Sequence, residues 1–99
     1  MLKSAFGIYI QDYFFMMYLV LDVQSTNHTD NCSQLNAWVN VKNHVAAMEI
    51  LHEELSLEGW ALTNVVESSE TDESDYFPPC KSLDAFKEAE KNLVALRFL

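Results

Sequence analysis

Residues 13–23 read YFFMMYLVLDV, and this stretch decides the fold of the chain. Aromatic and β-branched side chains are frequent in it, which favours a β-strand. Its odd and even positions are both apolar up to Leu21, so neither side of such a strand suits contact with water. The pattern therefore predicts a strand over 13–23 that is buried on both faces.

The same run is too short to cross a membrane. Its uninterrupted apolar part, 13–21, lies between Asp12 and Asp22, whereas a transmembrane helix needs about 20 residues. Because no small-residue cleavage site follows, we do not expect a signal peptide. We therefore expect a cytoplasmic protein, in which Cys32 and Cys80 are free thiols. The length predicts a single domain over 1–99, with 1–12 as an N-terminal extension.

A hairpin and a helix are expected next. Residues 24–34 are rich in turn-forming residues, and 35–41 alternate apolar and polar side chains, which predicts a second strand paired with the first. Asn43 is placed to cap a helix over 44–58, whose apolar residues recur at helical spacing. Gly59 is a suitable residue to end that helix.

The rest of the chain predicts two strands and a second helix. Residues 60–66 read as a third strand, and 67–80 form an acidic loop. Ser82 is expected to cap a helix, and 93–99 alternate again as a closing strand.

The order β-β-α-β-α-β predicts an α+β two-layer sandwich, with a four-stranded mixed sheet and two helices on one face. This arrangement looks like a ferredoxin-like variant, an analogy of architecture that implies no function. The other face of the sheet would then expose Met16, Tyr18 and Trp38, an apolar patch larger than a monomer usually tolerates. We therefore expect a homodimer through the open sheet face, unless residues 5–10 fold over it.

Charge is distributed unevenly along the chain. The formal net charge is −9, and from Asn43 to Cys80 there are nine acidic residues and no Lys or Arg. Such a field repels phosphates and anionic lipid headgroups, so we expect no direct binding of nucleic acid or membranes. The acidic side chains are instead expected to meet a protein with a basic surface, and we single out Glu53, Glu54, Glu58, Glu70, Asp72, Glu73 and Asp75.

Residues that could carry chemistry do not form a recognisable motif. His44 and His52 are separated by about 12 Å along a helix, whereas paired metal-binding histidines lie four residues apart. The two cysteines belong to no CxxC pair, and the chain has two glycines, too few for a phosphate-binding loop. We therefore expect no catalytic, cofactor-binding or metal site.

Two functions remain open at this point. The first is a small acidic, non-enzymatic interaction module, one form of which is an inhibitor that imitates the charge of nucleic acid. The alternative is a small-ligand-binding or catalytic domain, with a cleft between helices and sheet near His52, Tyr76 and Cys80.

Overall fold

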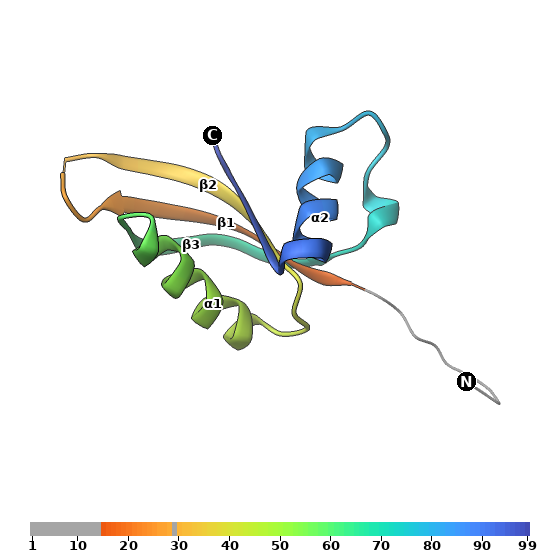
Figure 1. The fold of residues 1–99 in the computed structure, drawn as a ribbon, viewed down its shortest axis with the longest axis horizontal. Coiled ribbons are helices and arrows are strands. Elements are labelled where there is room, and N and C mark those ends of the chain that lie inside the picture. The colour runs from red at the N-terminus through yellow and green to blue at the C-terminus, as the bar shows by residue number, and fades with distance from the viewer. Residues whose placement is uncertain (1–14, 29) are drawn as a thin grey trace.

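The computed structural model describes residues 15–28 and 30–99 of the chain (Figure 1). These residues form a four-stranded sheet and two α-helices, which confirms the predicted α+β class. The predicted N-terminal extension (1–12), the expected cover by residues 5–10, and the first two residues of the predicted first strand lie outside the described residues. The elements are β1 (Met16–Ser25), β2 (Cys32–Val39), α1 (His44–Leu57), β3 (Trp60–Thr71), the 3-10 helix η1 (Glu73–Asp75), α2 (Lys81–Asn92) and β4 (Val94–Phe98).

The sheet has the strand order β3-β1-β2-β4, and each neighbouring pair is antiparallel. The prediction of a mixed sheet is therefore wrong. The connection through α1 does make β2 and β3 parallel to each other, but β3 pairs with the free edge of β1 and not with β2. An antiparallel strand thus separates the two parallel ones.

One face of the sheet packs against α1. Leu19 and Leu21 of β1 and Leu35 of β2 are fully buried there against Leu51 and Leu55 of the helix. Alternate side chains of a strand point to the same face of the sheet, so every second residue of β1 and of β2 contacts α1 or lies beside it. The buried core on this side comprises Met17, Leu19, Leu21, Val23, Leu35, Ala37, Val39, Ala47, Leu51 and Leu55.

The opposite face of the sheet packs against α2. Met16 and Trp38 meet Ala85, Phe86 and Ala89 there, in a second buried cluster that also contains a residue of β4. The prediction that both helices share one face is therefore wrong, and the ferredoxin-like analogy that depended on it is not confirmed. Figure 1 shows the two helices on either side of the strands. The reason lies in β1, whose apolar positions on both faces each require a cover.

The helix ends follow local chemistry in part. Asn43 caps α1 as predicted, since its side-chain oxygen accepts a 2.8 Å hydrogen bond from the Ala46 amide. Gly59 follows the end of α1 with a φ of +83°, a left-handed conformation that suits glycine. The residue that precedes α2, however, is Cys80, and Ser82 lies inside the first turn.

The segment 67–80 is more ordered in secondary structure than the predicted loop. Its first five residues continue β3 along the edge of β1, where Glu67 pairs with Val20 and Ser69 with Tyr18. The prediction of a loop from residue 67 is therefore wrong. It relied on the apolar pattern, which ends at Val66, whereas the backbone hydrogen bonds to β1 do not require apolar side chains. The turn that follows contains η1.

Candidate functional site

The aromatic side chains expected on an open sheet face lie beneath α2. Met16 and Trp38 are 0% and 2% exposed, so the prediction that they stand on a free surface is wrong. The Trp38 indole Nε1 donates a 2.9 Å hydrogen bond to the Tyr76 hydroxyl, and Tyr18 stacks at a tilt against the Trp38 ring. Burial raises the pKa of the Tyr18 hydroxyl, and the nearby Glu67 carboxylate and Tyr76 raise it further.

Apart from the half-buried Val20, the side chains of β1 and β2 on the rest of that sheet face are polar. Asp22 accepts hydrogen bonds from the side-chain amides of Gln34 and Asn64 at 3.0 and 3.3 Å. Tyr18 donates to the side-chain oxygen of Asn36 at 3.2 Å. A homodimer through this face therefore lacks the apolar surface from which it was inferred, and self-association itself stays a prediction.

Most of the acidic side chains between residues 70 and 75 stabilise their own turn. Asp72 and Asp75 form a reciprocal capping box around η1. Glu73 forms a 3.0 Å ion pair with Lys87 of α2, and this hydrogen bond raises the pKa of the Lys87 ammonium. Glu70 is exposed on β3. Asp72 and Asp75 are thus engaged within the turn and Glu73 with α2, so these three carboxylates are less available to a partner than the sequence suggests.

A different set of glutamates lines a cavity of about 300 Å³ beside β4. Glu54 lies in α1 and Glu58 directly follows it, on one side of the sheet, and Glu88 comes from α2, on the other side. Because β4 is the last strand in the order β3-β1-β2-β4, a cavity lined from both sides of the sheet and from β4 runs along the outer edge of that strand. We call it the β4 slot, and its lining residues are Glu54, Leu55, Glu58, Glu88, Val94, Leu96 and Phe98.

The β4 slot combines an apolar floor with an acidic rim. Val94, Leu96 and Phe98 supply the floor, and Phe98 remains 48% exposed. The three glutamates supply negative charge, and that of Glu88 is partly balanced by a 2.8 Å ion pair with Arg97, which lies outside the slot lining. This chemistry suits an apolar group that carries positive charge beside it.

The sequence indicated this site in part. Glu54 and Glu58 were among the acidic residues expected to meet a partner, and both line the slot. Glu53, which was expected to act with them, is exposed and does not line the slot. Glu88 and the residues of β4 were not predicted. The alternation of Val94, Leu96 and Phe98 was a signal for a shared face, but their place at a sheet edge depends on tertiary structure.

The alternative cleft near His52, Tyr76 and Cys80 is not formed. His52 is exposed on α1, on one side of the sheet, whereas Tyr76 packs with the α2 cluster on the other. Cys80, which precedes α2, and Cys32 are both free thiols. Within 15–28 and 30–99, groups of three or more His, Cys, Asp or Glu that could hold a metal ion are absent.

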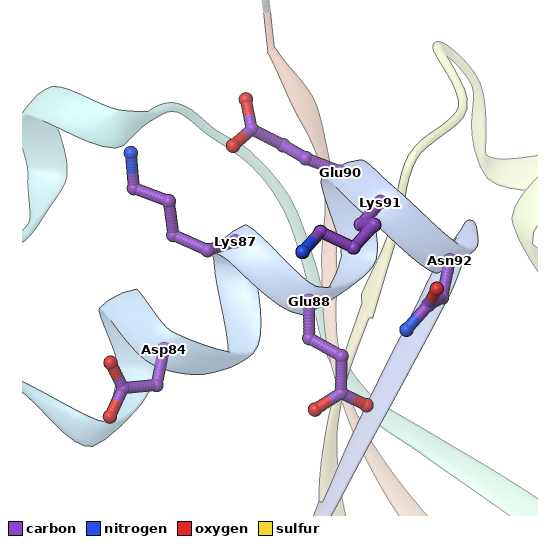
Figure 2. A pocket seen from close by; sticks show the side chains of 6 residues that line it. All are labelled: Asp84, Lys87, Glu88, Glu90, Lys91 and Asn92. Carbon is purple, nitrogen blue, oxygen red and sulfur yellow. The ribbon is translucent and has the colours of Figure 1, made fainter.

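Two other depressions involve α2. One, of about 620 Å³, is lined by residues of this helix alone, so it has no opposing wall (Figure 2). Figure 2 shows Glu88 extending alongside the strand that follows the helix, while Lys87 and Glu90 extend from the other side of the helix. The second depression has a volume of about 400 Å³. Its lining contains residues of both charges: Lys81 and Asp84 of the helix and Arg97 of β4.

Comparison of the chain with protein-family models, with curated proteins and with solved structures gives no match. Neither of the two α-helices in the described part of the chain is long and apolar enough to cross a membrane. Function must therefore be inferred from the geometry above.

Proposed function

We propose that this chain is a small acidic, non-enzymatic protein-interaction module that binds a basic protein surface at the β4 slot. The observation that carries the proposal is the slot itself, where an apolar floor on an edge strand is rimmed by Glu54, Glu58 and Glu88. Apolar contact supplies affinity, and the negative charge of Glu54 and Glu58 selects partners rich in Lys or Arg.

The charge of the whole chain supports the same partner class. A net charge of −9 attracts a basic protein at a distance and repels acidic ones. A protein that uses its own basic surface to bind nucleic acid is one such partner, and for it this module would act as an inhibitor that imitates nucleic-acid charge. A cytoplasmic location is part of the proposal.

The oligomeric state expected from the sequence needs its own measurement. Light scattering after size exclusion, at low and high salt, gives the mass in solution. We expect no dimer through the sheet face on the α2 side, because its apolar residues Met16 and Trp38 are already buried by α2.

A matched pair of double variants tests the proposed function. The probe is an array of ten-residue peptides in which Lys and Arg are mixed with apolar residues, beside an array with Glu in place of the basic residues. We expect basic members alone to bind, and binding to weaken in high salt. The double variant Glu54→Gln with Glu58→Gln should lower the affinity for the basic peptides by about tenfold, as expected for charges at an interface.

The control pair is Glu49→Gln with Glu53→Gln, which removes the same charge from the same helix at exposed positions outside the slot lining. This pair should change affinity by no more than about twofold, since exposed charges act weakly through solvent. The proposal is overturned if no basic peptide binds, or if both pairs weaken binding equally.

A further inference from the structure

We propose that the partner enters the β4 slot as an extended strand that pairs with β4 and adds a fifth strand to the sheet. This inference rests on the proposed function and names the partner: a protein segment that alternates apolar residues with Lys or Arg. Addition of a strand to a sheet edge uses main-chain hydrogen bonds for affinity and alternate side chains for specificity.

The backbone register shows which groups of β4 point into the slot. The Leu99 amide donates to the Gln34 carbonyl at 3.0 Å, and the Asn40 amide donates to the Leu93 carbonyl at 2.8 Å. Since hydrogen-bonding residues alternate in an antiparallel pair, residues 93, 95, 97 and 99 bond to β2. The amides and carbonyls of 94, 96 and 98 therefore point away from the sheet, and within the described residues β4 has no strand on that side.

The same three residues present their side chains to the slot. Val94, Leu96 and Phe98 thus offer both the main-chain groups and the apolar floor that a paired strand needs. Side chains of an added strand alternate between the two faces of the sheet. Those on the α1 side would cover the floor beside Glu54 and Glu58, and those on the α2 side would lie beside Glu88.

Arg97 occupies part of this edge in the free protein. Its Nη1 donates to the Leu96 carbonyl at 2.9 Å, and its Nη2 donates to Glu88 at 2.8 Å. The Leu96 carbonyl is one of the outward acceptors, so Arg97 covers a group that an added strand would use. A charged side chain folded over a strand edge is a known protection against unwanted pairing. A partner with its own Lys or Arg can replace Arg97 at Glu88.

The other edge of the sheet is less suitable. β3 is longer, but two register shifts interrupt its pairing with β1, between Val20 and Leu21 and between Asp22 and Val23. Bulged edges twist away from an incoming strand.

A second copy of this chain is also a poor occupant. Pairing of β4 with its own copy about a two-fold axis would place α1 beside its copy on the same side of the joined sheet. Glu54 and Glu58 would then approach the same residues of the copy. Like charges in such an arrangement oppose association, whereas a basic segment is attracted.

The experiment uses the full chain and three peptides. The first is Val-Lys-Val-Arg-Val-Lys-Val with blocked ends, the second has an N-methyl group on every backbone nitrogen so that neither of its edges can pair with β4, and the third has the same composition with Lys and Arg in one block. We expect the first to bind, and to protect the Val94, Leu96 and Phe98 amides from hydrogen exchange. The N-methylated peptide should lose about tenfold or more in affinity, because main-chain hydrogen bonds are lost.

Two variants with equal change of charge test the role of Arg97. Arg97→Gln should tighten binding of the first peptide by about threefold or more, since it frees the Leu96 carbonyl and Glu88. Lys91→Gln removes a positive charge at an exposed position of α2 and should tighten it much less. Equal effects of the two variants would show that net charge alone acts.

The outcomes separate the two proposals. If the basic peptides bind but the N-methylated peptide binds equally well, strand addition is overturned and the proposed function stands. If no basic peptide binds, the proposed function is overturned as well. If Arg97→Gln doubles the mass in solution, a second copy is the occupant, which overturns the assignment of a basic segment.

Discussion

Replacing Phe86 by alanine tests whether α2 covers the second face of the sheet. Phe86 is fully buried, and its ring lies 5.8 Å from the ring of Tyr76. Truncating a buried Phe to Ala costs about 3–5 kcal/mol through lost transfer energy and a residual cavity. A domain of this size has a total unfolding free energy of about 5–15 kcal/mol, so the loss is easily measured.

Urea unfolding followed by far-ultraviolet circular dichroism measures the change. Phe98→Ala is the matched control, because Phe98 is 48% exposed and should cost about 1 kcal/mol or less. In a Trp60→Phe background, Trp38 is the one remaining tryptophan, so its fluorescence reports whether α2 shields it from water. We expect a blue-shifted emission that moves to longer wavelength when Phe86 is truncated. A cost below about 1 kcal/mol for Phe86→Ala would refute the packing described here.

A double-mutant cycle then decides on which face α2 packs. Phe86→Leu is the milder variant if the alanine variant does not fold. Phe86 shares a buried cluster with Trp38, whereas Leu51 belongs to the cluster on the other face. We expect Phe86→Leu and Trp38→Phe to be non-additive by about 0.5 kcal/mol or more, and Phe86→Leu and Leu51→Val to add within about 0.5 kcal/mol. Coupling of Phe86 to Leu51 alone would place both helices on one face.

Three further predictions concern individual contacts. Tyr76→Phe should cost about 1–3 kcal/mol in urea unfolding, because the buried Trp38 indole loses its acceptor; an unchanged midpoint would contradict that hydrogen bond. Gly59→Ala should lower the stability by about 1–2 kcal/mol in thermal unfolding, because φ is +83° there; the space around the glycine is open enough that conformation is the main cost. Burial and Glu67 raise the pKa of Tyr18 above 10.0, so its contribution to stability is complete below pH 10.0 and is lost as the pH rises through the raised pKa. Unfolding measured at about pH 8 and about pH 11 should therefore show a smaller alkaline loss in Tyr18→Phe than in the natural chain.

The candidate site was predicted only in part, for a physical reason. Glu54 and Glu58 stood out as acidic residues of a helix, because charge is a property of the sequence itself. That Glu88, 30 residues further on, shares their cavity depends on α2 packing on the opposite face and reaching the same strand edge. Asp72 and Asp75 stood out equally, yet the structure uses them to cap η1.

The sequence by itself determined the helices and most of each strand, because hydrophobic periodicity and caps such as Asn43 act over a few residues. It also indicated apolar residues on both faces of β1, but the structure buries the odd-numbered side from Met17 to Val23, whereas on the other side Met16 is buried and Tyr18 to Gln24 are only half-buried. The tertiary structure alone decided which helix covers which face and which strands lie at the two edges of the sheet. Those choices depend on β3 pairing with β1 and on β4 pairing with β2, contacts between residues far apart in the chain that local patterns do not encode.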